Sequence, residues 1–200
     1  MRAHPAGPRH GEVIAATAAP MPPAGDPGAL QSSIWPAGTH RGDDGALVIG
    51  GVDVRRIARD FSTPVFVLDE SDFRARAADF RDAYAGADVY YAAKAFLATA
   101  VARWAVDEGL GIDVASGGEL AVALAAGVPG ARLLMHGNNK SRSEIQRALE
   151  VGVGRIVVDS LQEIDRIAEV AASLGTRAAV LVRVTVGVEA HTHEFIATAH

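Results

Sequence analysis

The 200-residue chain contains no cysteine. Disulfide bridges, thiolate nucleophiles and cysteine-ligated metal sites all need a thiol, so the sequence excludes these kinds of chemistry. The absence suits a reducing compartment, and we expect the protein to be cytoplasmic. The chain also lacks any apolar run close to the ~20 residues that a membrane-spanning helix needs, so no membrane partner is expected.

Positive charge is also in short supply. Lys and Arg number 19 against 24 Asp and Glu, which gives a formal net charge of -5. This balance argues against nucleic acid or an anionic membrane surface as the main partner. The remaining composition, 49% hydrophobic and 22% charged, is ordinary for a globular protein.

Large apolar residues are almost missing from residues 1–40, where prolines and glycines are frequent. Such a segment buries too little surface to offset its ordering entropy, so we predict a flexible Pro/Gly-rich arm. The competing interpretation is a signal peptide built on Arg9 and the apolar run Val13–Ala19. That run is short and has no leucine, which favours the arm.

Short apolar runs alternate with longer amphipathic segments in the rest of the chain. The expected strands are Val89–Ala93, Gly111–Ala115, Arg132–Met135, Arg155–Val158 and Ala179–Val184. The expected helices are Leu97–Glu108, Glu119–Ala126, Ser143–Val151 and Gln162–Leu174. Runs without clean alternation are typical of strands covered on both faces, as in a parallel sheet. Two further runs, Ala46–Ile49 and Pro64–Asp69, suggest earlier strands.

Local signals mark the helix ends. Ser116, Ser141 and Ser160 are each followed three residues later by a glutamate, which predicts three capping boxes. Glycines stand where the four helices should stop, the position that favours a left-handed residue: Gly109, Gly127, Gly152 and Gly175. Signals repeated in register with the strands predict an α/β fold of repeated strand–helix units.

One ionisable residue lies at or just past the carboxyl end of each expected strand. These strand-end residues are Lys94, Asp113, His136, Asp159 and Arg183. In a (β/α) barrel they would meet at the face that carries active sites. A doubly wound sheet would line them along a crevice, but the glycine-rich dinucleotide motif is absent after the first strand. Asp159 is more simply explained as part of a helix start.

Lys94 is the most informative of these residues. A lysine between apolar neighbours at the mouth of a strand is suited to lose its proton and attack an aldehyde. Its surroundings, Tyr90-Tyr-Ala-Ala-Lys-Ala-Phe96, and the segments Pro64-Val-Phe-Val-Leu-Asp69, Gly111-Ile-Asp-Val-Ala-Ser-Gly-Gly-Glu-Leu120 and His136-Gly-Asn-Asn-Lys-Ser141 carry a resemblance. The chain resembles the amino-terminal part of the diaminopimelate decarboxylase family, fold-type III, alanine racemase-like enzymes that use pyridoxal 5'-phosphate.

The resemblance implies a truncated pyridoxal-phosphate-binding (β/α)8 TIM-like barrel, incomplete over residues 70–200, in which residues 41–69 are strands that join a β domain. It implies that Lys94 is joined covalently to the cofactor and that Asp113, His136 and Arg183 line its pocket. The activity implied is decarboxylation of meso-2,6-diaminopimelate to L-lysine, the last step of lysine biosynthesis, by a homodimer. Since further site residues of the family lie beyond residue 200, we expect this chain alone to be inactive.

Other functions stay open. The Tyr-Ala-x-Lys segment that ends at Lys94 is shared with ornithine and arginine decarboxylases, which are specific for other basic amino acids. A non-enzymatic pyridoxal-phosphate-binding barrel is another possibility, although the two early strand-like runs argue against a lone barrel. The chain could also act as an inactive partner of intact subunits. A metal site is not expected, because the spacing of His191, His193, Glu194 and His200 fits no helix face.

Overall fold

The computed structural model describes residues 28–184. Residues 35–183 form one compact unit, to which the description below applies. The first 27 residues of the predicted arm lie outside the described part, as does the histidine-rich segment near residue 195, and residues 28–39 contain turns but no helix or strand. No helix between residues 28 and 184 combines the length and apolar character needed to cross a bilayer.

A small antiparallel sheet begins the described part. Its strands, in the order β1–β2–β3, are His40–Arg41, Leu47–Ile49 and Val52–Asp53. The expected early strand Ala46–Ile49 is therefore present as β2. Helix α2 (Val54–Phe61) follows, with Asp53 as its N-cap. Sequence analysis did not predict α2, although Val54, Ile57 and Phe61 recur at helical spacing; none of its residues is buried within the described part of the chain.

The second early run is not a strand. Residues 64–69 belong to no helix or strand and pair with no strand in the described part of the chain, and Phe66 is 96% exposed. A β-rich composition makes a strand only where a partner supplies the hydrogen bonds, so Pro64–Asp69 forms no strand in this structure, and its place in a β domain stays a prediction. The run leads into helix α3 (Glu70–Ala83), which was also not predicted and whose N-cap, Asp69, accepts from the Ser71 and Asp72 amides.

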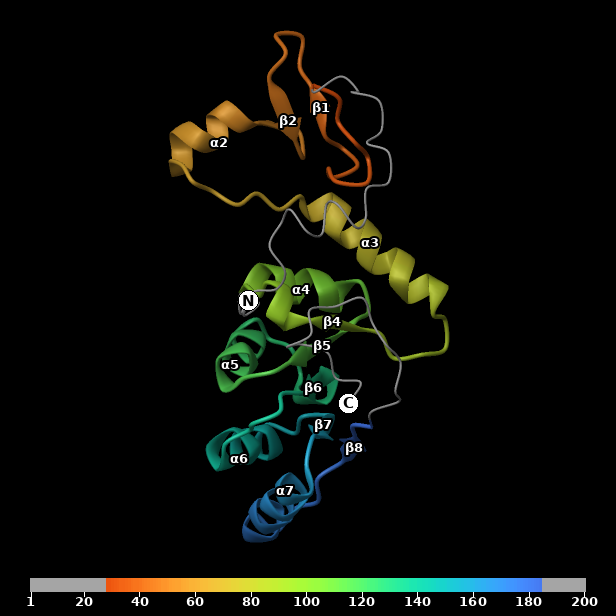
Figure 1. Cartoon of the computed structure of the whole chain (residues 1–200), viewed down its shortest axis with the longest axis vertical. Helices are drawn as coiled ribbons and strands as arrows, with labels where there is room; N and C mark the ends of the chain where they lie inside the picture. The colour runs from red at the N-terminus through yellow and green to blue at the C-terminus, as the bar shows by residue number, and fades with distance from the viewer. Residues whose placement is uncertain (1–27, 185–200) are drawn as a thin grey trace, which may run out of the picture. The chain divides into compact units, whose positions relative to one another are not determined.

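A five-stranded parallel sheet forms the main body. Its strands follow chain order: β4 (Tyr90–Ala92), β5 (Gly111–Val114), β6 (Leu133–Met135), β7 (Arg155–Val158) and β8 (Val180–Val182). Four helices connect them: α4 (Thr99–Asp107), α5 (Gly117–Ala125), α6 (Arg142–Glu150) and α7 (Leu161–Ser173). Helices α5, α6 and α7 follow one another along one side of the sheet (Figure 1). The fold is α/β with the strand–helix repeat of a barrel, which needs eight strands when complete.

The two faces of the parallel sheet differ. Ile112 and Val114 of β5, with their counterparts in β6 and β7, pack with the helices in the hydrophobic core. Alternate residues, among them Leu134 and Val157, line a cavity instead. In the described part of the chain helices therefore cover one face, which corrects the expectation that both faces are covered. A strand with one covered face normally alternates apolar and polar residues. Here the cavity-facing residues are apolar as well, so the strands have the sequence pattern of strands covered on both faces.

All four predicted helix-ending glycines have a positive φ, as expected. The capping boxes are only partly as predicted. Ser141 and Glu144 form the full reciprocal box. Ser116 and Ser160 accept from the third helical amide, but Glu119 and Glu163 reach back one residue further, to the amides of Ala115 and Asp159. Ala115 and Asp159 directly follow strands β5 and β7, so the glutamates join the end of each strand to its helix.

One glycine is required by a close approach of the backbone. A Cβ atom on Gly130 would lie 2.0 Å from the Val151 carbonyl oxygen and 2.8 Å from that of Gly152. Both contacts are with main-chain atoms, which cannot rotate aside. The turn before β6 can therefore press against the end of α6 only if this position has no side chain.

Candidate active site

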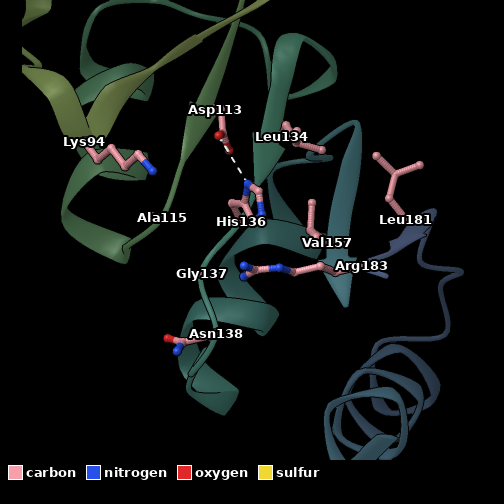
Figure 2. A pocket seen from close by; sticks show the side chains of 10 residues that line it. All are labelled: Lys94, Asp113, Ala115, Leu134, His136, Gly137, Asn138, Val157, Leu181 and Arg183. Carbon is pink, nitrogen blue, oxygen red and sulfur yellow. Dashed lines mark hydrogen bonds and ion pairs between the residues drawn. The ribbon is translucent and has the colours of Figure 1, made fainter. Parts of the chain in front are cut away.

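Four of the five strand-end residues meet at one cavity of about 570 Å³ (Figure 2). Its lining residues come from the carboxyl ends of the parallel strands and the loops that follow them: Lys94, Asp113, Ala115, Leu134, His136, Gly137, Asn138, Val157, Leu181 and Arg183. Asp159, the fifth, does not line it. The prediction that the strand ends meet at one side of the sheet is confirmed, and a cavity of this size is in the range of cofactor sites.

Lys94 lies just after the strand rather than on it. Strand β4 ends at Ala92, and Lys94 is the middle residue of a single 3-10 turn, Ala93–Ala95. The Tyr91 hydroxyl donates to the Phe96 carbonyl across this turn, at 2.6 Å. The Tyr91 ring packs edge-on against Phe73 of α3, with centroids 5.3 Å apart. A core-anchored tyrosine thus holds the turn, and the exposed Lys94 amine points into the cavity (Figure 2).

The chain has only two lysines, Lys94 and Lys140. Lys140 is 1% exposed, and its ammonium donates to two carbonyl groups and pairs with Glu163. An aldehyde in solvent therefore has one lysine side chain to react with in this chain. Sequence analysis did not single out Lys140, although its place in the His-Gly-Asn-Asn-Lys-Ser segment is a signal that could have drawn attention to it.

Asp113 and His136 form a polar pair on adjacent strands. The Nδ1 atom of His136 lies 3.2 Å from Oδ2 of Asp113, and both side chains are partly exposed to the cavity. Gly137 then turns the chain with φ near +93°, and a Cβ there would lie 2.7 Å from the Ala115 carbonyl oxygen. The loop after β6 therefore passes directly over the end of β5, which keeps His136 beside Asp113.

Arg183 reaches the cavity from β8, the edge strand opposite to β4 in the five-stranded sheet. It follows β8, and its guanidinium extends toward His136 and Gly137 (Figure 2). Nη1 donates to Oδ1 of Asp159 at 2.9 Å. The N-cap of α7 is Ser160, and the side chain of the preceding Asp159 pairs with the Arg183 cation instead of a first-turn amide of the helix.

The residues present fit pyridoxal phosphate. Oδ1 of Asp113 is buried and has no hydrogen-bond partner in the described part of the chain, which is unfavourable for a carboxylate. The cofactor carries suitable donors in its ring hydroxyl and protonated ring nitrogen. The apolar side chains of Leu134, Val157 and Leu181 suit a flat ring, and Lys94 offers an amine for its aldehyde.

Comparison with known proteins agrees with this fit. Residues 70–200 match the family described as "Pyridoxal-dependent decarboxylase, pyridoxal binding domain", and the chain belongs to this family. Diaminopimelate decarboxylase from Mycobacterium leprae is 51% identical over 203 residues, which span all of this chain and 43% of that protein. The enzyme of the same name from Mycobacterium tuberculosis H37Rv is 53% identical over 172 residues, 86% of this chain and 38% of that protein.

A solved structure gives the same result. Diaminopimelate decarboxylase from M. jannaschii, in complex with L-lysine, superposes with a TM-score of 0.65 at 30% identity. The match covers 74% of this chain and 36% of that one. The recognition of the diaminopimelate decarboxylase family and the barrel-type fold are thereby confirmed, and so is pyridoxal phosphate as cofactor. The chain spans less than half the length of the relatives that it matches.

The residues weighed as metal ligands, His191, His193, Glu194 and His200, lie outside the described residues. Between residues 28 and 184 no group of three or more potential ligands could hold a metal ion.

Proposed function

We propose that this chain forms the lysine-bearing part of an enzyme that converts meso-2,6-diaminopimelate to L-lysine. One observation carries the proposal: the one accessible lysine side chain of the described residues projects into the cavity at the carboxyl ends of the strands. The identity to relatives of that name supports the substrate, and so does the lysine complex of a structural neighbour. In this reaction one carbon–carboxylate bond breaks, CO2 leaves, and a proton takes its place.

Lys94 would provide the amine that holds the cofactor in the cavity. When bound, pyridoxal phosphate supplies an electron-accepting ring for the pair of electrons released as CO2 leaves. The apolar side chains of Leu134 and Val157 shield one side of the cavity from water, which strengthens electrostatic interactions there. Tyr91 holds the turn that aims the lysine.

The polar residues have positioning roles. Asp113 fixes the His136 imidazole, and its free oxygen accepts a hydrogen bond from the bound group. Arg183, steadied by Asp159, places a positive charge where anionic groups of the cofactor or substrate enter. None of the three breaks the bond; each limits the orientations that Lys94 and the ring can adopt.

Borohydride trapping tests the attachment site. The chain is incubated with pyridoxal phosphate, reduced and digested, and the modified peptide is identified by mass spectrometry. We expect the adduct on Lys94 and none in Lys94→Ala. An adduct on Lys140, or an equal yield in Lys94→Ala, would refute the assignment.

Substrate choice needs a separate test. The chain is produced as one polypeptide with the remaining length of a mycobacterial relative, and CO2 release is measured with diaminopimelate, ornithine and arginine. We expect turnover of diaminopimelate alone, and none by the 200-residue chain. Faster turnover of ornithine or arginine would favour the rival decarboxylase, and cofactor binding without any turnover would favour a non-enzymatic carrier.

The domain organisation is part of the proposal. Residues 1–40 serve as an arm, residues 41–69 join a β domain, and residues 70–200 form the first part of the barrel. We further propose that the complete enzyme is a cytoplasmic homodimer. Light scattering of the joined polypeptide tests the dimer, since a monomeric mass would contradict it.

A further inference from the structure

The side chain of Lys140 is the largest of the fully buried side chains, at 1% exposed. Its Nζ atom donates to the Gly137 carbonyl at 2.6 Å and to the Val157 carbonyl at 2.7 Å, and lies 3.0 Å from Oε2 of Glu163. Glu163 is 3% exposed. The ammonium thus donates to two main-chain carbonyl groups and has the Glu163 carboxylate as its counter-ion.

The two carbonyl groups belong to residues that line the active-site cavity. Gly137 lies in the loop after β6, between His136 and Asn138, and Val157 lies near the end of β7. One buried cation therefore ties the loop that carries His136 to the neighbouring strand. Lys140 itself does not line the cavity, so it makes these contacts from outside the cavity lining.

Glu163 extends the connection. The same Oε2 atom accepts from the Asp159 amide at 2.9 Å, and the Asp159 side chain holds Arg183. The main chain of Lys140 is fixed as well, since Arg166 of α7 donates to its carbonyl oxygen. The Lys140–Glu163 pair thus joins the loop after β6, which carries the cavity residues His136 and Asn138, to the loop after β7, which holds the cavity residue Arg183 through Asp159.

We propose that Lys140, with Glu163, is a positioning residue that sets the spacing of these two loops and so places His136 and Arg183 for the cofactor. The proposal rests on the proposed cofactor site. It differs from a purely structural role because the acceptors are cavity-lining main-chain groups. Loss of the ammonium would remove a donor from two main-chain carbonyl groups and the counter-ion from the buried Glu163 carboxylate, and the loops would move in response.

The test compares Lys140→Met with Ile145→Ala in the full chain. Ile145 is fully buried in α6 but does not line the cavity, so its truncation lowers stability without removing a loop contact. We expect Lys140→Met to weaken pyridoxal phosphate binding, measured by absorbance titration, about tenfold or more. Ile145→Ala should stay within about twofold of the unsubstituted chain. Native affinity in Lys140→Met, or an equal loss in both variants, would overturn the proposal.

A second measurement does not need the cofactor. Hydrogen exchange followed by mass spectrometry reports the protection of amides in residues 136–141 and 158–160. We expect Lys140→Met to speed amide exchange in both loops and to leave the exchange of residues 90–96 unchanged. Faster exchange in one loop only, or equally faster exchange throughout the protein, would contradict the proposal.

If Lys140→Met does not fold, Glu163→Gln replaces it, because glutamine keeps the shape and an acceptor but removes the charge. The same two measurements then apply, with a smaller effect expected in the same loops, and native affinity with native exchange would overturn the proposal. If the unsubstituted chain binds no cofactor, the proposed function fails, and the exchange pattern still decides the role of Lys140.

Discussion

The hydroxyl group of Tyr91 donates a 2.6 Å hydrogen bond to the Phe96 carbonyl oxygen and closes the turn that carries Lys94. Burial raises the pKa of Tyr91, so the phenol stays protonated and able to donate at neutral pH. The position of the reactive amine therefore depends on a side chain that does not enter the cavity.

Tyr91→Phe should lower the free energy of unfolding by about 1 kcal/mol, the ordinary value of one such hydrogen bond. It should also slow the reaction of Lys94 with pyridoxal phosphate, because the turn loses its tie. Urea unfolding and stopped-flow absorbance measure the two effects. Tyr90→Phe is the matched control, since the Tyr90 hydroxyl makes no hydrogen bond within residues 28–184. Equal effects in both variants would refute the role of Tyr91.

Asp113→Asn should weaken pyridoxal phosphate binding roughly fivefold. The substitution keeps the size of the side chain but removes the charge that strengthens the His136 contact, a difference of about 1 kcal/mol. Absorbance titration measures the affinity. Asp165→Asn, on the exposed surface of α7, should have no effect. An unchanged affinity in Asp113→Asn would show that the pair does not support the cofactor.

Stability should fall in acid through Glu144. Hydrogen bonds from the Ser141 amide, and then from the Gly117 amide and the Ser141 hydroxyl, hold the pKa of Glu144 below its ordinary value of 4.5. A carboxyl group with a lowered folded-state pKa stabilises the fold above its unfolded pKa, and this contribution is lost as the pH falls toward the folded value. Thermal unfolding between pH 7 and pH 3 should show a smaller decline in Glu144→Gln. Parallel curves for both proteins would contradict the assignment.

Gly130→Ala should prevent folding or lower stability by about 3 kcal/mol or more, because the new Cβ meets main-chain oxygens that cannot move aside. Gly118→Ala is the control. Its Cβ would have one neighbour, Ser116 Oγ at 3.8 Å, and it lies inside helix α5, so stability should rise by about 0.5–1 kcal/mol. Chemical denaturation checks both, and similar values for the two variants would refute the packing argument.

Much of the parallel sheet could be predicted from the sequence. The run Arg155–Val158 is β7 residue for residue, and Gly109 ends α4 with the expected positive φ. Strand-end ionisable residues identified the cavity because parallel strands bring their carboxyl ends together. These signals are local and repeat with each unit, so they need no knowledge of distant contacts.

The features that were missed depend on distant contacts. Nothing near Lys140 in the chain shows that Val157 and Glu163 will surround it, and the same segment would suit an exposed loop. The failed strand at Pro64–Asp69 has the composition of a strand but no partner within residues 28–184. Glu119 matched the capping-box spacing, yet it binds the amide of Ala115 because the strand ends immediately before the helix cap.

The order of the parallel strands has a consequence for folding. Every strand from β5 to β8 pairs with the strand that precedes it in the chain, so none of these pairings within residues 28–184 waits for a segment synthesised much later. Each new unit can add to a finished surface while the ribosome is still extending the polypeptide. The Lys94 turn follows the first of these strands, so its framework is made early in synthesis, well before Arg183 emerges.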